Sequence, residues 1–224
     1  MNRKLTSILA GSASILIIGT TSANAAVTVT DNGLTVPTIG ADDTGYTGTT
    51  NQRFGWDTGE GFTQSFTVPT AGTIGSIYLG YNAFDNGDTI TLDLSVNGSF
   101  VQTVVLDGDN FSGIASGPGA DGNGGENYWM EFDLSGENVA VVTGAAANSF
   151  TLLATANTGD SWAFAPRLNQ NGNPYSGGGL SQPTGSTYNP PTNSDMAFVV
   201  TVVPEPSTAL LGGLGFLVLL RRRR

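Results

Sequence analysis

The sequence predicts an all-β protein: a single β-sandwich or jelly-roll domain between an N-terminal signal peptide and a short C-terminal transmembrane helix. Three observations support this fold class. Short segments that alternate apolar and polar residues follow one another, separated by Gly, Asn and Asp turns. Helix signals are nearly absent between residues 26 and 202. Long uncharged, mainly apolar segments stand near both ends of the chain.

The first residues indicate export. Arg3 and Lys4 precede an apolar stretch at residues 5–18, and Ala23-Asn24-Ala25 matches the A-x-A site that signal peptidase cuts. We expect residues 1–25 to be a signal peptide that signal peptidase removes after Ala25. A retained membrane helix is the alternative interpretation, but the apolar stretch is short for one. The folded domain is then expected at residues 26–202.

The clearest strand is predicted at residues 89–96, where every second residue is apolar. Asn97-Gly98 follows directly and is the strongest short hairpin signal, so residues 99–106 are expected to pair back. Further strands are expected at residues 27–30, 34–36, 62–68, 74–81, 128–134, 139–142, 149–155, 162–164 and 196–203. Gly, Asn, Thr and Pro are frequent in residues 40–52, 107–127 and 169–194, which we expect to be loops.

Three short stretches add to the fold prediction: Gln64-Ser65-Phe66, Tyr175-Ser176-Gly177-Gly178 and Asp195-Met196-Ala197-Phe198. This pattern resembles the jelly-roll modules that are common in bacterial surface proteins, many of which are similar to carbohydrate-binding modules. The resemblance implies a jelly-roll-like β domain and offers sugar binding as one function of it.

The chain contains neither cysteine nor histidine. Disulfide bonds, thiolate metal sites, Ser-His-Asp triads and histidine-ligated zinc are therefore excluded. Between the signal peptide and the C-terminal segment, two arginines stand against 17 acidic residues, a net charge of −15. We expect no binding to nucleic acid or anionic lipid, because this part has no basic patch to neutralise phosphates. Calcium or a neutral sugar is compatible with the charge.

The C-terminal segment has three successive parts. Pro204-Glu205-Pro206 should be extended, because each proline fixes φ and lacks an N–H, and Ser207 is a good N-cap for a helix that begins after it. Residues 208–220 carry no charge, and residues 221–224 are four arginines that hold the end on the cytoplasmic side. A helix over these 13 apolar residues would reach about 20 Å against a hydrocarbon core of about 30 Å. It could span only with snorkelling arginines and a thinned bilayer, or serve as a temporary tether.

The order of this motif, helix and basic end resembles the PEP-CTERM sorting signal of Gram-negative bacteria, over residues 203–224. The resemblance implies processing near Pro204, Glu205, Pro206 and Ser207 by an exosortase, a membrane-embedded cysteine transpeptidase. It also implies a membrane-anchored precursor whose product reaches the cell surface, the outer envelope or the medium, often beside exopolysaccharide systems. An ordinary C-terminal membrane anchor is the alternative.

One predicted loop concentrates oxygen ligands, from Asp107, Asp109, Asp121, Asn123 and Glu126. Calcium takes six to eight such ligands, and the many glycines would let backbone carbonyls join them. The spacing matches no EF-hand. A structural calcium site and a solvated, turn-rich loop are the two interpretations.

The candidates for stacking on a sugar ring are Trp129, Trp162 and Tyr175, because an aromatic face fits the apolar face of a pyranose. Trp129 is expected on the strand face opposite Phe132, and therefore exposed; packing in the core or under loops is the alternative. Arg167 is one of two cations in the domain and is expected to pair with a carboxylate, with a ligand role as the alternative.

The functional expectation is a non-enzymatic cell-surface or extracellular-matrix protein, associated with exopolysaccharide or biofilm and without catalytic residues. A carbohydrate-binding module, with or without calcium, is the first alternative. A glycoside hydrolase is the second, since Glu131 and Asp133 would share a strand face. That chemistry needs two carboxyls facing one cleft, about 5 to 9.5 Å apart.

Overall fold

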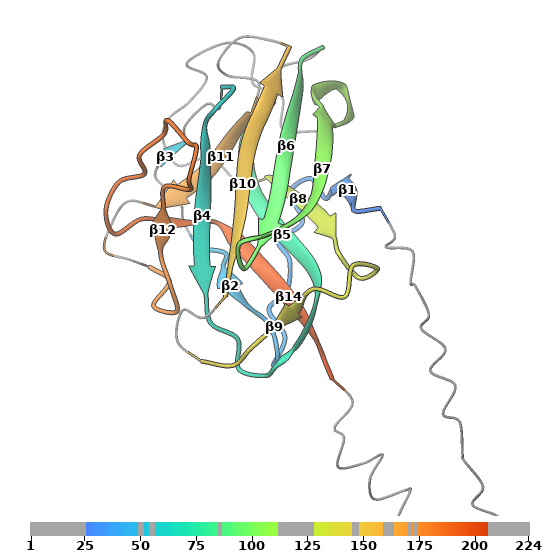
Figure 1. The fold of residues 1–224 in the computed structure, drawn as a ribbon, viewed down its shortest axis with the longest axis vertical. Helices are drawn as coiled ribbons and strands as arrows, with labels where there is room; N and C mark the ends of the chain where they lie inside the picture. The colour runs from blue at the N-terminus through green and yellow to red at the C-terminus, as the bar shows by residue number, and fades with distance from the viewer. Residues whose placement is uncertain are drawn as a thin grey trace, which may run out of the picture.

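The computed structural model describes residues 26–48, 52–53, 57–84, 87–111, 128–144, 148–158, 164–169, 172 and 174–205. These residues form two sheets packed face to face, and their pairs of strands are antiparallel (Figure 1). The predicted all-β fold is confirmed, and the two layers are those of a β-sandwich. The predicted signal peptide and the helix after Ser207 lie outside the described residues. Within the described ranges, no helix is long and apolar enough to cross a bilayer.

The smaller sheet has five strands in the order β12-β4-β10-β6-β7. Their bounds are Leu180–Ser181 for β12, Gly61–Phe66 for β4, Asn148–Asn157 for β10, Thr89–Val96 for β6 and Ser99–Asp107 for β7. β4, β10 and β6 run side by side in Figure 1. We call this layer the small sheet.

The large sheet has nine strands and is built around β5, Gly72–Phe84. Its main order is β1-β8-β5-β11-β13, with bounds Thr28–Asp31, Tyr128–Asp133, Gly72–Phe84, Phe164–Asn169 and Asp195–Met196. Four strands join it off this path: β14 (Phe198–Pro204), β2 (Thr44–Tyr46), β3 (Gln52–Arg53) and β9 (Ala140–Val141). A single helical turn, η1 (Gly108–Asn110), follows β7.

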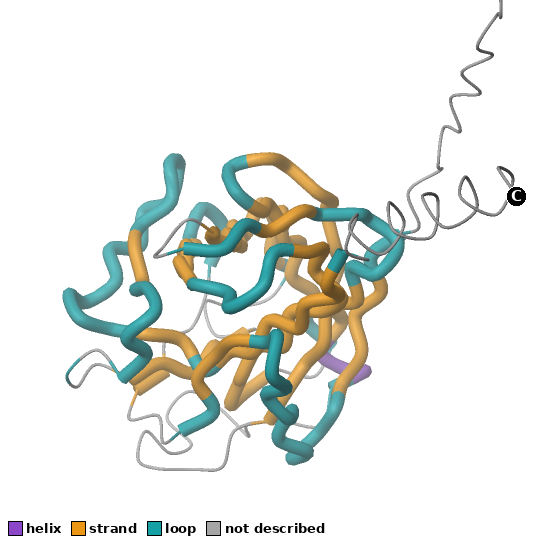
Figure 2. The backbone as a smooth tube through the Cα atoms, turned by 90° about the horizontal axis from the view of Figure 1, so that it is seen from below, coloured by secondary structure: helices purple, strands orange, loops and turns teal. Residues whose placement is uncertain are grey.

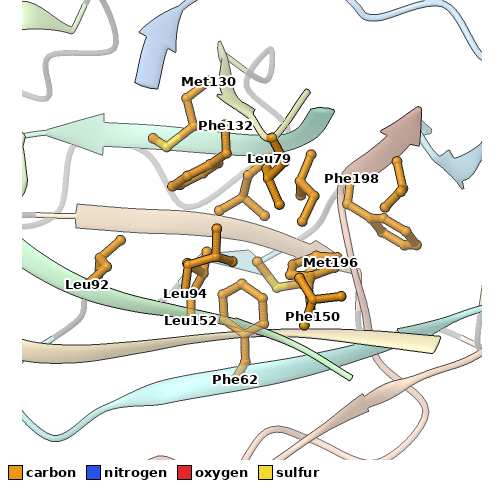
Figure 3. Close-up of a cluster of buried hydrophobic side chains, with 14 of the residues drawn as sticks. Phe62, Leu79, Leu92, Leu94, Met130, Phe132, Phe150, Leu152, Met196 and Phe198 are labelled. Atoms are coloured by element: carbon orange, nitrogen blue, oxygen red, sulfur yellow. The ribbon is translucent and has the colours of Figure 1, made fainter. Parts of the chain in front are cut away.

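The core lies between the sheets, where alternate residues of each strand meet. In Figure 3, Phe62, Leu94 and Leu152 of the small sheet face side chains of the large sheet, among them Leu79 and Phe132. Figure 2 shows the same strands arranged around this interior. All five of these side chains are fully or almost fully buried, and the burial of such core side chains favours packing of the two layers.

Several predicted strands are confirmed. β6 has the predicted bounds, and its burial alternates from residue to residue. Asn97 and Gly98 both have positive φ, 52° and 75°, as the two-residue turn of a type I′ hairpin requires. Met196, Phe198, Val200 and Val202 are all buried, as predicted for the closing strand.

Other predictions of secondary structure were wrong. Residues 34–36 form no strand: Thr35 N–H closes a turn onto the Asn32 carbonyl, and Leu34 and Val36 are exposed. Three alternating residues are too few to form a strand when no neighbouring strand pairs with them. Conversely, β2 and β12 lie in segments expected to be loops, because strands of two or three residues carry no readable alternation.

Candidate functional site

A groove of about 490 Å³ crosses the outer face of the small sheet. Its floor comes from β4, β10 and β6, one wall from the β6–β7 hairpin, and the other from the segment just after β12. The lining residues are Thr63, Asp93, Ser95, Gly98, Phe100, Ser149, Thr151, Leu153, Gln182, Pro183 and Thr184. It is larger than another hollow of about 270 Å³ that also adjoins the β6–β7 hairpin.

Strand register explains the hydroxyl-rich floor. Thr151 of β10 lies opposite Thr63 of β4 on one side and opposite Ser95 of β6 on the other. The two threonine hydroxyls are 2.7 Å apart and hydrogen-bonded. In the neighbouring row, Asp93 accepts a hydrogen bond from Thr103 Oγ1 at 2.5 Å. The floor therefore offers several hydroxyl groups and one carboxylate, and none of the described lining residues is a cation.

Phe100 stands at the hairpin end of the groove with 61% of its surface exposed. Its position is fixed by the turn before it. Asn97 Nδ2 donates to the Ala140 carbonyl at 3.2 Å, and Asn97 Oδ1 accepts from Ser149 N–H at 2.9 Å. These two bonds tie the hairpin tip to β9 and β10, so the backbone that carries the exposed ring belongs to a tied hairpin and not to a free loop.

Sequence reasoning missed this groove. The polar face of residues 89–96 was predicted, but an outward polar face is ordinary for a half-solvated sheet and indicates no site. The available signal was Phe100, a large apolar residue directly after a hairpin turn. Gln182-Pro183-Thr184 gave no signal, because the segment comes to lie beside β10 only through the pairing of β12 with β4.

The sugar-stacking candidates that the structure describes do not lie on an exposed surface. Trp129 lies in β8 opposite Gly80, on the outer face as expected, but it is fully buried, so its predicted exposure was wrong. The large sheet is covered at this point, where Gly80 and Val199 are buried too. Among the described residues, the indole Nε1 has no hydrogen-bond partner. Trp162 lies outside the described residues.

Arg167 and Tyr175 are also inside the fold. Arg167, in β11, is fully buried, and its carbonyl accepts from Ala197 N–H at 3.0 Å. Tyr175 is 9% exposed and packs edge-on against Phe198, with ring centroids 5.1 Å apart. Neither residue presents an open face to solvent, and neither lines the groove. Their suggested ligand role stays a prediction.

Tyr175 belongs instead to a buried polar network. Its hydroxyl is 2.7 Å from Thr44 Oγ1 and accepts from Thr67 N–H at 3.0 Å. Its own N–H donates to Asp195 Oδ2 at 3.2 Å, and Gln64 Nε2 donates to Asp195 Oδ1 at 3.0 Å. Burial raises the pKa of Asp195 above its ordinary value. The stretches that carry the jelly-roll resemblance therefore meet in space.

Glu131 and Asp133 share the outer face of β8 but have separate partners. Glu131 Oε1 accepts from Ser76 Oγ at 2.6 Å and from Tyr78 Oη at 2.8 Å. Burial, together with the Glu131 carboxylate, raises the pKa of Tyr78 to about 12. Asp133 accepts from Ser135 N–H at 2.9 Å, and bonding from Ser135 lowers its pKa.

The predicted calcium ligands are described only in part. Asp107 caps η1 by accepting from Asp109 N–H at 3.1 Å, and Asp109 accepts from Gly87 N–H at 2.8 Å. Both carboxylates therefore accept hydrogen bonds from backbone N–H groups in turns. Asp121, Asn123 and Glu126 lie outside the described residues. In the described part of the chain, no three acidic side chains are grouped so as to hold a metal ion.

The last strand leads into the C-terminal segment. β14 pairs with β5 along its whole length, and its final pair joins Pro204 to Gly72. Glu205 is exposed; Pro206 and Ser207 lie outside the described residues, as do Ala23 and Ala25 of the predicted signal-peptide site. A family model described as the PEP-CTERM protein-sorting motif matches residues 202–224. The chain carries a PEP-CTERM sorting motif.

The predicted sorting signal is therefore confirmed, and the PEP-CTERM match begins at residue 202, inside β14. The PEP-CTERM motif marks an exported protein, made as a membrane-anchored precursor and sorted by an exosortase. No curated protein and no solved structure is significantly similar to the chain.

Proposed function

We propose that the sandwich is a non-enzymatic protein of the cell surface or extracellular matrix, associated with exopolysaccharide. In this proposal, signal peptidase removes residues 1–25 and the exosortase then acts near Pro204–Pro206. The observation that carries the proposal is the continuity of β14 with the PEP-CTERM motif. Because β14 ends at Pro204, the first residue of the Pro-Glu-Pro triplet, a cut after the strand would release an intact sandwich.

The described carboxylates support a non-enzymatic role. Glu131 accepts hydrogen bonds from Ser76 and Tyr78, while Asp133 accepts one from the backbone of Ser135. Each carboxylate therefore bonds to its own neighbours and the two share no partner among these bonds. The chain has no histidine or cysteine to act as base or nucleophile. The strong negative charge of the domain would keep it soluble in a hydrated matrix.

Processing can be tested in the producing cells with a tag on the C-terminus. A pulse-chase is run in the parent strain, in a strain without the exosortase, and with the motif variant Glu205→Ala/Pro206→Ala. Glu205 is exposed, so this variant should leave the sandwich folded. We expect the tag to be lost only from the unchanged protein in the parent strain. Retention of the tag there would overturn the proposal, and mass spectrometry of the surface protein would show both mature termini.

The groove on the small sheet favours a second function for the same domain, that of a carbohydrate-binding module. Its hydroxyl-rich floor beside an exposed aromatic ring suits a sugar better than a protein or a lipid. Polysaccharide pull-down with and without calcium tests this function and any metal dependence together. Incubation with the same polysaccharides and analysis for released products tests the glycoside-hydrolase alternative.

A further inference from the structure

We propose that the groove across the small sheet binds an extended, uncharged polysaccharide chain, with Phe100 as its stacking platform. The inference deepens the proposed function and rests on it, since it places the exported sandwich among exopolysaccharide. Nothing in the sorting motif implies such a site. The direction of the groove, its chemistry and the tied hairpin that carries Phe100 each support this binding mode.

The groove runs across the strands. One row of paired positions crosses the sheet from Ser181 of β12 through Thr63, Thr151 and Ser95 to Phe100 of β7. Neighbouring strands lie about 4.8 Å apart. That step is close to the length that one pyranose unit adds to an extended glycan. Successive sugars laid along the row would therefore each meet the outward side chain of the next strand.

The chemistry of the row fits hydroxyl groups. Threonine and serine hydroxyls both donate and accept, so the Thr63–Thr151 pair can reorient toward the hydroxyls of a sugar. Asp93 adds a strong acceptor on the floor, and its partner Thr103 holds it in place. Solvent-facing positions of many sheets carry Ser and Thr; what sets this face apart is the wall at Pro183 and the exposed ring opposite it.

Phe100 supplies the apolar part of recognition. Its ring is 61% exposed on a tied hairpin, so a pyranose face can stack on it without first ordering the backbone that carries it. It also borders a second hollow of about 270 Å³, which includes Ser99, Glu137 and Val139. A chain that passes over Phe100 would continue from one hollow into the other.

Charge selects the class of polysaccharide. The lining residues that the structure describes include one carboxylate and no cation, and the whole domain carries a net charge of −15. A polyuronate or a sulfated glycan would be repelled at close range, whereas a neutral glycan would meet no such penalty. The structure therefore favours a neutral chain.

The test uses the mature protein purified from the surface of producing cells. Binding of cellohexaose, xylohexaose and mannohexaose is measured by calorimetry, with hexagalacturonate as the charged comparison. We compare the unchanged protein with Phe100→Ala, Phe100→Trp and Thr151→Val. Val105→Ala is the matched control, because Val105 is 64% exposed on the same strand but does not line the groove.

At least one neutral hexasaccharide should bind, and Phe100→Ala should weaken it about tenfold through the lost stacking contact. Phe100→Trp should restore or strengthen binding, and Val105→Ala should change nothing. Thr151→Val keeps the side-chain shape and should weaken binding roughly three- to tenfold. The unfolding curves of the Phe100 and Val105 variants should coincide with that of the unchanged protein within error, because both positions are exposed.

Three results would overturn the proposal: no binding of any neutral hexasaccharide, equal affinity of Phe100→Ala and Val105→Ala, or tighter binding of hexagalacturonate. C-terminal processing is measured separately in the same strain, by following the loss of the C-terminal tag. Normal processing without sugar binding would remove the groove site alone. An uncut surface protein would remove the proposed function, whatever the calorimetry shows.

Discussion

Gln64 connects the two sheets through Asp195. From β4 of the small sheet, its Nε2 donates to Asp195 Oδ1 at 3.0 Å, and its Oε1 accepts from Met196 N–H at 2.9 Å. Both side chains are fully buried, with an exposed fraction of 0%. Each atom of the amide is therefore used, and the pair fixes how β4 lies over β13.

Gln64→Leu should lower the free energy of unfolding by about 2–4 kcal/mol, since it leaves the buried Met196 N–H unpaired and removes one donor from a buried carboxylate. Urea unfolding at neutral pH measures the loss. Gln182→Leu is the matched control: Gln182 is exposed, and we expect a change below about 0.5 kcal/mol. Equal stability of the two variants would contradict the role given to Gln64.

Asp195 predicts a dependence of stability on pH. Its pKa in the folded state is raised above the ordinary value of 3.8, so the folded state holds this proton more tightly than the unfolded state. The contribution of Asp195 to stability is therefore largest below pH 3.8 and is lost as the pH rises through the folded-state pKa.

In Asp195→Asn this contribution is absent. The asparagine offers one acceptor for two N–H donors, so the variant should be less stable than the unchanged protein by about 1–3 kcal/mol. The difference between the two should shrink as the pH is raised from 4 to 7. A constant difference across that range of urea titrations would show that Asp195 does not titrate as described.

A pair of adjacent glycines gives a sharp packing test. A Cβ on Gly178 would clash with the backbone carbonyl of Ser65, whereas a Cβ on Gly179 would meet open space. Gly178→Ala should therefore cost several kcal/mol, on the order of the largest single-residue effects, or prevent folding. Gly179→Ala should be close to neutral in thermal unfolding. Similar melting temperatures for the two variants would show that this segment is not packed on β4.

The hairpin turn links stability to the groove. Asn97→Ala removes both bonds that tie the turn and places alanine at a φ of 52°, so it should cost about 2 kcal/mol. Sugar binding should fall as well, because Phe100 loses its fixed position. Val105→Ala, on β7 of the same hairpin and outside the lining of both hollows, is the control for both measurements. Unchanged affinity in a destabilised Asn97→Ala would show that Phe100 needs no support from the turn.

Local signals account for the elements that the sequence predicted well. Residues 89–96 alternate strictly and end at Asn97-Gly98, so β6, its turn and the start of β7 can be predicted from neighbouring residues alone. β2 could not be predicted, because Thr44–Tyr46 becomes a strand only by pairing with Phe198–Val200, far along the chain. The face of Trp129 was predicted correctly, but its burial depends on what covers that face.

Phe100 shows why the groove was missed. Strict alternation would place residues 100, 104 and 106 on one face, and the apolar pattern puts Val104 and Leu106 in the core. The register shifts between Leu94 and Ser95, so that Ser95 pairs with Phe100 while Leu94 pairs with Gln102. This bulge turns Phe100 outward. A one-residue irregularity in pairing leaves no mark in composition or periodicity.

Because Pro204 still pairs with Gly72, only a short linker connects the folded domain to the apolar segment. Three residues lie between Pro204 and Thr208, the first residue of the apolar segment, and the four Cα–Cα steps that join the two span at most about 14 Å. A domain with 17 carboxylates and two guanidinium groups is thus held close to the leaflet. An anionic leaflet would repel so acidic a domain at this short range, so cutting the connecting residues would let the domain move away from the membrane.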